Sequence, residues 1–319
     1  MPQEGKDSPS SAGLDHVTVM LCTFNGERFL AQQLDSIADQ THSRWSVVVS
    51  DDGSSDATLD ILRSYQARWG VEKLKILDGP RNGFAQNFMS IVCDLADTSD
   101  YYSWADQDDI WHEEKIAKAL EWIKTVPDHV PALYCGRTET ITASGESVGK
   151  SPLFKRPPSF NNSLVQSLAG GNTMVFNRAA QQVLKNIGRS FPIVSHDWWA
   201  YLVICGVGGI VHYDERPFVC YRQHGSNLVG SNSDLYSRLK RLGMMFSGRF
   251  QEWNQNNITA LESMQSLLTT SNRSILNDFK RARNGSIAKR FLNLKRSGVY
   301  RQTKLGGCAL MLAVLCNAI

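Results

Sequence analysis

The stretch Tyr101-Tyr102-Ser103-Trp104-Ala105-Asp106-Gln107-Asp108-Asp109 carries most of the information about the fold. Its first five residues are typical of a buried strand, and the apolar spacing after it predicts a helix over Trp111–Val126. Three carboxylates are thereby crowded onto one turn between a strand and a helix. Because unpaired acids in such a turn repel one another, a hard divalent cation, Mg²⁺ or Mn²⁺, would stabilise it.

The tetrad also fits a solvated turn without a metal. In that interpretation Asp109 caps the following helix, because the positive end of a helix favours an acid. The motif by itself is compatible with both interpretations. The rest of the chain favours the metal site.

Composition indicates an ordinary globular protein. The chain has 319 residues, of which 42% are hydrophobic, enough to bury a large α/β core. Residues 1–14 are polar and lack the cationic start and apolar run of a secretory signal, so we expect a disordered N-terminal tail and no export. The seven cysteines form no CxxC pair, which favours a cytoplasmic protein and argues against zinc.

Charge is concentrated near the C-terminus. Residues 273–319 hold ten Lys or Arg and one acid, Asp278, and the stretch from Leu305 to Ile319 has no charged side chain. That stretch is shorter than the ~20 residues of a membrane-spanning helix, but it suits the surface of an anionic membrane. A solvated helix followed by a segment packed on the core or on another subunit fits equally well. Nucleic-acid binding is not expected, because few aromatic residues accompany these charges.

Short β-rich runs alternate with amphipathic windows from Val17 onward. This pattern predicts an α/β fold with a mostly parallel central sheet and helices on both faces, over residues 15–231, followed by a C-terminal helical region over residues 232–319. The expected strands are Val17–Cys22, Ser46–Ser50, Leu74–Leu77 and Tyr101–Ala105, extended later by Leu133–Cys135, Thr173–Phe176, Ile210–Tyr213 and Phe218–Tyr221. Ligands of such sheets bind beyond the carboxyl ends of the strands, so the loops there should converge on one crevice.

Two of these loops offer groups for a nucleotide. Asp51 and Asp52 could accept hydrogen bonds from a base or a ribose, while Ser54 or Ser55 could cap the next helix. Phe24 would pack either on a planar base or in the core. The chain lacks a phosphate-binding glycine loop, so a metal would have to hold any pyrophosphate and neutralise charge on a leaving nucleoside diphosphate.

Two further motifs lie in the second half of the chain. Asp197 opens an apolar helical window beside aromatic residues, where an acid suits a general base or simply the first turn of a helix. His224 follows a strand-like run and would complete a metal site or contact a phosphate; without a ligand, a surface position is the default for such a histidine.

Taken together, these segments resemble the family 2 glycosyltransferases, which have the nucleotide-diphospho-sugar transferase (GT-A) fold, and among them the bacterial rhamnosyltransferases. The resemblance spans residues 20 to about 230. It rests on the segments Met20–Glu27, Asp51–Asp56, Asn82–Phe84, Asp106–Trp111, His196–Trp199 and Tyr221–Gly225, in family order and spacing.

The resemblance implies a role for each matching residue. The nucleotide pocket would be lined by Thr23, Phe24, Asn25, Glu27, Asp51, Asp52, Asn82, Gly83, Asp106 and Gln107. Asp106 and Asp108 would form the DxD motif, with Asp108 and His224 as metal ligands and Asp197 as the catalytic base. Sugar or acceptor contacts would come from Asp109, Trp111, Asn172, His196 and Trp198.

The implied reaction is a Mg²⁺- or Mn²⁺-dependent single displacement that inverts the anomeric carbon. It would transfer L-rhamnose from dTDP-rhamnose to a glycan or lipid-linked acceptor of the bacterial cell surface, with the C-terminal segment holding the enzyme on the cytoplasmic face of the inner membrane. The Q-x-x-R-W signature of processive family members is absent from the sequence, which implies one transfer at a time. The alternatives are a UDP-hexose donor, a sugar-nucleotide pyrophosphorylase, a metal-dependent phosphoesterase and a catalytically inactive binding module.

Overall fold

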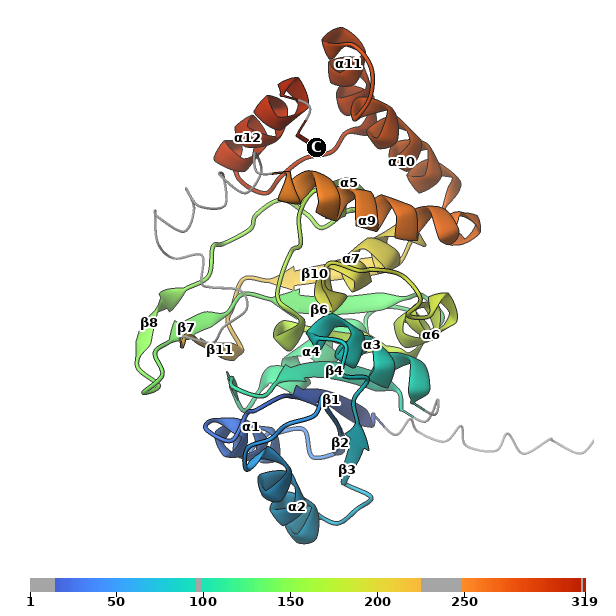
Figure 1. Ribbon diagram of the computed structural model, residues 1–319. Coiled ribbons are helices and arrows are strands. Elements are labelled where there is room, and N and C mark those ends of the chain that lie inside the picture. Colours follow the sequence, from blue (N-terminus) through green and yellow to red (C-terminus); the bar gives the residue numbers. More distant parts are fainter. Residues whose placement is uncertain (1–14, 96–98, 225–247, 317) are drawn as a thin grey trace, which may run out of the picture.

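The computed structural model describes residues 15–95, 99–224, 248–316 and 318–319 (Figure 1). The expected N-terminal tail and the expected domain boundary near Asn232 lie outside these residues. The division into two regions therefore stays a proposal.

A seven-stranded sheet forms the centre of the molecule. In spatial order its strands are β10 (Ile210–Asp214), β6 (Ala132–Gly136), β9 (Val175–Asn177), β4 (Tyr101–Asp106), β1 (Val17–Thr23), β2 (Trp45–Asp51) and β3 (Leu74–Asp78). Neighbours are parallel except around β9, which runs antiparallel to both β4 and β6. The expected, mostly parallel sheet is confirmed.

Helices cover both faces of this sheet because successive side chains of a strand point to opposite sides. Met20 of β1 faces one hydrophobic cluster, which includes residues of α3 (Phe84–Asp94), α6 (Arg178–Ile187) and α7 (His196–Gly206). Leu21 faces the other, which includes residues of α1 (Leu30–Ala38), α2 (Thr58–Trp69) and α4 (Lys115–Ile123). The strand is buried along its whole length, which explains why five of its seven residues are apolar.

A second, four-stranded sheet lies beside the first. Its order is β5 (Ile110–Trp111), β11 (Val219–Arg222), β7 (Glu139–Ile141) and β8 (Ser147–Lys150). Two predictions are therefore wrong: the segment Phe218–Tyr221 does not extend the main sheet, and Trp111 belongs to a strand, with the helix starting only at Lys115. Buried Trp111 pairs with Val219, and this long-range contact overrides the helical spacing.

The C-terminal region is helical in its described part, as expected. Its helices α9 (Arg249–Ser263), α10 (Thr270–Ala282), α11 (Ile287–Ser297) and α12 (Lys304–Leu315) gather at the end of the molecule opposite α1 and α2 (Figure 1). Leu261, Phe279 and Val314 join the same hydrophobic cluster as α7, so this region packs on the α/β core. Further short helical segments are α5 (Phe160–Ser163), a 3₁₀ turn at Gly171–Thr173 before β9, and a 3₁₀ turn at Gln265–Leu267 between α9 and α10.

Candidate active site

The loops after β1, β2 and β4 meet at one edge of the main sheet. Thr23 is paired in register with Asp51, and Cys22 is paired with Asp106. The convergence follows from parallel pairing, since parallel strands end at the same edge. The expected convergence of these loops at one edge of the sheet is therefore confirmed.

Asp51 organises the loop that follows it. Its Oδ2 accepts hydrogen bonds from the Thr23 hydroxyl at 2.7 Å and the Ser54 hydroxyl at 2.6 Å. Its Oδ1 accepts the backbone N–H groups of Gly53 and Ser54, at 3.1 and 2.8 Å. The alternative that Ser54 or Ser55 caps α2 is wrong, because the N-cap residue of α2 is Ala57 and no side-chain cap hydrogen bond is present there.

Asp52 shapes the neighbouring loop between β3 and α3. Its carboxylate accepts the backbone N–H groups of Arg81 at 2.6 Å and Gly83 at 3.2 Å. Both residues have left-handed backbone conformations, with φ of 56° and 80°, which a glycine adopts freely and an arginine does not. Asn82 lies between them and is exposed to solvent.

Phe24 stands on the first loop as an exposed aromatic, with 56% of its surface accessible, so a position in the core is excluded. Gln107 holds it there through both backbone groups of Phe24, accepting its N–H at 2.8 Å and donating to its carbonyl at 3.0 Å. A planar ring fixed beside the acidic turn suits stacking on a base.

Asn25 and Glu27 join this loop to the start of α2. Asn25 Oδ1 accepts the backbone N–H of Ser55, and Glu27 Oε2 accepts that of Ala57, at 2.8 and 2.9 Å. Asp56 Oδ1 accepts the backbone N–H of Thr58 at 3.0 Å. Acids at this helix start are favoured by its unpaired N–H groups and positive dipole, so Asn25 and Glu27 position the loop.

The acidic turn brings Asp106, Asp108, Asp197 and His224 together. Burial, followed by repulsion from Asp108 and Asp197, raises the pKa of Asp106 to about 7. His224 Nε2 lies 2.7 Å from Asp108 Oδ2. Carboxylate oxygens with one imidazole nitrogen form a donor set that suits Mn²⁺ or Mg²⁺, and a cation would also relieve this repulsion.

Asp109 turns away from the crevice and into the protein. It is fully buried, accepts a hydrogen bond from the Asn172 amide, and accepts the backbone N–H of Arg222 at 3.2 Å. Burial and then the charges of Asp108 and Asp106 raise its pKa. In this position Asp109 can neither cap a helix nor contact a sugar. Asn172, which is also buried, donates its amide hydrogen bond to Asp109 instead of contacting a sugar.

Arg222 anchors the backbone of the turn, a role that the sequence did not indicate. Its guanidinium is buried and donates to the carbonyl of Asp108 at 2.9 Å, to that of Ala143 at 3.0 Å and to Gln32 Oε1 at 2.6 Å. It also lies 4.5 Å from the centroid of the Phe29 ring. These partners come from distant parts of the chain, so spacing along the sequence carries no signal for them.

Lys115 is a second buried cation that sequence reasoning missed. Its ammonium donates to the Ser103 hydroxyl at 2.8 Å and lies 3.3 Å from the centroid of the Trp111 ring. Burial lowers its pKa, while Asp109 and Asp106 act in the opposite direction. Lys115 therefore lies close to the acidic turn without being exposed to solvent. Trp111, 3% exposed, belongs to the core instead of contacting a sugar.

Asp197 lies in the first turn of α7. Its Oδ1 accepts hydrogen bonds from the backbone N–H of Trp198, at 2.7 Å, and from the Ser195 hydroxyl. The charge of Asp197 contributes to the raised pKa of Asp106, so this carboxylate lies near the acidic turn. Trp198 is only 6% exposed and donates its indole N–H to the carbonyl of Ser163 at 2.6 Å. The expected sugar or acceptor contact by Trp198 is therefore wrong, since the ring is used in packing.

His196 is also buried under the crevice. Its ring stacks on Phe88 at a centroid distance of 3.9 Å and meets the edge of Trp104 at 4.7 Å. Neither ring nitrogen has a hydrogen-bond partner within the described part of the chain. Burial lowers the pKa of His196 to about 4, so it is a neutral core residue and not the expected sugar contact.

This burial makes an acid-sensitive core. The pKa of His196 is about 4 in the folded chain, below its ordinary value of 6.5. At pH values between these two, the imidazole is protonated in the unfolded chain and neutral in the folded chain. Stability contributed by the neutral ring is complete above pH 6.5 and falls by up to about 1.4 kcal/mol per pH unit toward pH 4. Chemical denaturation across pH 4–7 should show a shallower dependence in His196→Gln. His129→Gln, at an exposed position, should keep the wild-type slope; equal slopes in all three proteins would contradict this.

Comparison with known proteins identifies the family. A family model described as "Glycosyl transferase family 2" matches residues 18–183, more than half of the chain. A dTDP-rhamnosyl transferase, RfbG of Shigella flexneri, is 26% identical over 254 residues, which cover 76% of this chain and 83% of that protein. An uncharacterized glycosyltransferase of Nostoc sp. is 25% identical over 222 residues, or 66% of each chain.

Solved structures agree with this at the level of the fold. S. aureus TarS in complex with UDP-GlcNAc superposes with a TM-score of 0.55 at 17% identity, covering 89% of this chain and 93% of that one. The mannosyltransferase PcManGT from Pyrobaculum calidifontis, in complex with GDP-Man and Mn²⁺, gives a TM-score of 0.50 at 17% identity, covering 99% and 89%. The chain therefore belongs to glycosyl transferase family 2 and has the GT-A fold.

Proposed function

We propose that this glycosyltransferase is a metal-dependent, inverting enzyme that transfers L-rhamnose from dTDP-rhamnose to a glycan or lipid-linked acceptor of the bacterial cell surface. The observation that carries the proposal is the contact of Asp108 with His224, beside Asp106, whose carboxylate is repelled by those of Asp108 and Asp197. Asp106, Asp108 and His224 offer a cation site, and Asp197 offers a base beside it.

Each part of the site has a defined task in this mechanism. Phe24 packs on the base, and the loop organised by Asp51 borders the nucleotide. Asp108 and His224 would hold Mg²⁺ or Mn²⁺ with Asp106 beside them, and the cation supplies positive charge for the leaving diphosphate. Asp197 accepts the proton of the acceptor hydroxyl as its oxygen attacks the anomeric carbon, which inverts the configuration in one displacement.

The donor is proposed from the relative named as a dTDP-rhamnosyl transferase, whose match extends over three quarters of this chain. Transfer and donor hydrolysis should be measured with dTDP-rhamnose, UDP-hexoses and GDP-hexoses in the presence of Mn²⁺. The expected result is a preference for dTDP-rhamnose in kcat/KM. A preference for a UDP-hexose would overturn the rhamnose assignment and leave the proposed chemistry intact. Formation of a nucleoside triphosphate and a sugar 1-phosphate when pyrophosphate is added would instead indicate a pyrophosphorylase.

We also propose that the C-terminal helices rest on an anionic membrane surface, where a lipid-linked acceptor would lie. Exposed apolar side chains occur on α11 (Ile287, Phe291 and Leu292) and on α12 (Leu305, Met311, Leu312 and Leu315). Exposed basic residues accompany them at Lys289, Lys295, Arg296 and Lys304. Not every cation of this segment is available, because Arg283 and Arg290 bond the backbone carbonyls of Ile319 and Leu315. Within the described residues, no helix has the length and apolar character to cross a bilayer.

Polar substitution should weaken this membrane contact. The variant Phe291→Gln with Leu312→Gln removes two exposed apolar groups and should reduce binding to anionic vesicles by about 2 kcal/mol, or roughly 30-fold. Sedimentation with vesicles containing phosphatidylserine measures it. Val71→Gln, an exposed position that follows α2 at the opposite end of the molecule, should bind as the wild type does. Equal sedimentation of both variants would exclude α11 and α12 as the contact.

A further inference from the structure

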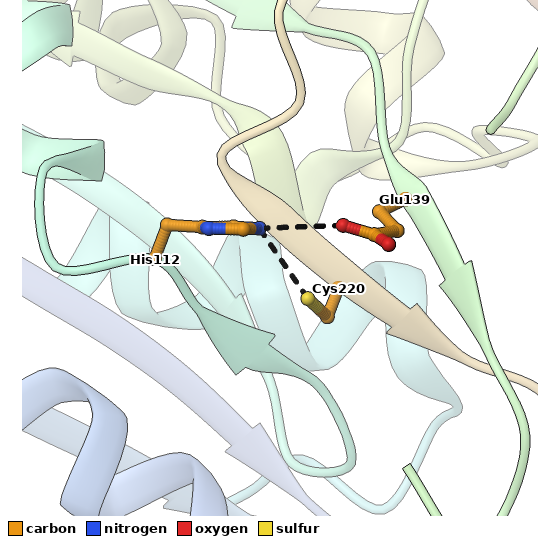
Figure 2. A group of neighbouring side chains, drawn as sticks. All are labelled: His112, Glu139 and Cys220. Carbon is orange, nitrogen blue, oxygen red and sulfur yellow. Dashed lines mark hydrogen bonds and ion pairs between the residues drawn. The ribbon is translucent and has the colours of Figure 1, made fainter. Parts of the chain in front are cut away.

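A group of potential metal ligands lies on the small sheet, apart from the acidic turn. Figure 2 shows His112, Glu139 and Cys220 with their side chains turned toward one another. His112 Nε2 is 3.4 Å from Cys220 Sγ and 3.8 Å from Glu139 Oε2. One ligand atom from each residue lies within 4.8 Å of the other two, and all three residues are partly accessible to solvent.

The pairing of the strands creates this group. Cys220 of β11 is in register with Glu139 of β7 on one side and with Ile110 of β5 on the other. Residues opposite each other in register share a face, as do alternate residues of a strand. The backbone N–H of His112 continues the pairing of β5 by donating to the carbonyl of Phe218 at 3.0 Å. His112 therefore reaches the same face as Cys220 and Glu139.

We propose that His112, Glu139 and Cys220 bind a borderline-soft divalent transition ion of the Zn²⁺ class. A thiolate, an imidazole and a carboxylate are the three ligand types that Zn²⁺ takes in proteins, and a solvent molecule would complete a tetrahedron. A thiolate ligand discriminates against Mg²⁺, which prefers oxygen. The proposal uses none of the residues assigned to the nucleotide sugar.

The distances fit such an ion with little movement. With Zn–S of about 2.3 Å and Zn–N of about 2.05 Å, a tetrahedral site places sulfur and nitrogen about 3.6 Å apart, and nitrogen and oxygen about 3.3 Å apart. The corresponding separations here are 3.4 and 3.8 Å. The other carboxylate oxygen of Glu139 accepts the Ser147 hydroxyl, a contact that orients the ligand oxygen as outer hydrogen bonds do in metal sites.

Cobalt tests the proposal directly, because a thiolate bound to Co²⁺ gives a sulfur-to-metal charge-transfer band. The intact protein, purified without metal and then titrated with Co²⁺ in excess Mg²⁺, should develop this band. Cys220→Ser should abolish it, while Cys308→Ser, at an exposed cysteine on α12, should retain it. A band that persists in Cys220→Ser, or its absence from the wild type, would overturn the proposal.

Zinc affinity and stability give an independent measurement. Competition with a chromophoric chelator should show Zn²⁺ binding that weakens at least about tenfold in His112→Gln and in Glu139→Gln. Zn²⁺ should raise the melting temperature of the wild type, because an ion that binds only the folded chain stabilises it, and should leave Cys220→Ser unchanged. Equal Zn²⁺ affinity in the wild type and in all three variants would show that the group does not bind metal.

Discussion

Replacing Asp197 with asparagine is expected to lower kcat by about 100-fold or more, because a positioned general base contributes roughly 10²- to 10⁴-fold to such reactions. The change keeps the size of the side chain and an oxygen that can accept the N–H of Trp198, so α7 should form normally. Affinity for the nucleotide sugar should change little. Steady-state kinetics combined with calorimetric binding of the donor measures both quantities.

Asp60→Asn is the matched control for this result. Asp60 is also an acid in the first turn of a helix, α2, but its side chain is largely exposed to solvent. It should retain wild-type kcat. If Asp197→Asn also retained wild-type kcat, the acid would serve only the helix start and another base would be required.

Asp108→Asn is expected to remove the dependence of donor binding on metal and to lower kcat/KM roughly 100-fold. This factor corresponds to a loss of about 3 kcal/mol of transition-state stabilisation, because a cation near the leaving diphosphate stabilises its developing negative charge. The reason lies in the pairing of Asp108 with His224, which supplies one oxygen and one nitrogen ligand. Binding of the nucleoside diphosphate should be measured with Mn²⁺ and with EDTA.

The control for this variant is Asp94→Asn, which changes a partly exposed acid at the end of α3 that is paired with Arg189. Its donor affinity should still increase when Mn²⁺ replaces EDTA. If Mn²⁺ increased the affinity of Asp108→Asn for the nucleoside diphosphate as strongly as that of the wild type, the cation would have to bind elsewhere. The proposed mechanism would then be wrong.

Most of the main sheet was predictable because its signals are local. Mostly apolar runs such as Val17–Cys22 predicted buried parallel strands, and parallel pairing predicted that the loops after them converge at one edge. The small sheet was not predictable, because β5 contains only two residues and is defined by its pairing with β11. A pair of apolar residues, Ile110 and Trp111, fits the start of a helix equally well.

The residues near the acidic turn also show which features the sequence predicts and which only the folded structure determines. Their identity and order were enough to locate the turn and to indicate a cation, because three acids in four positions need compensation wherever they are partly buried. Which acid faces the crevice could not be predicted. Asp106 remains at the crevice while Asp109 is buried against Asn172 and Arg222, and these partners lie 63 and 113 residues away along the chain.

Local patterning along the chain was therefore sufficient for most strands of the main sheet and for the loops that meet at its edge. The tertiary structure alone decided that Trp111, His196 and Trp198 are core residues and that Arg222 and Lys115 support the turn. It also brought together His112, Glu139 and Cys220, whose spacing resembles no zinc motif. The physical reason is that hydrophobic periodicity is a property of neighbouring residues, whereas burial and coordination depend on groups that only folding makes adjacent.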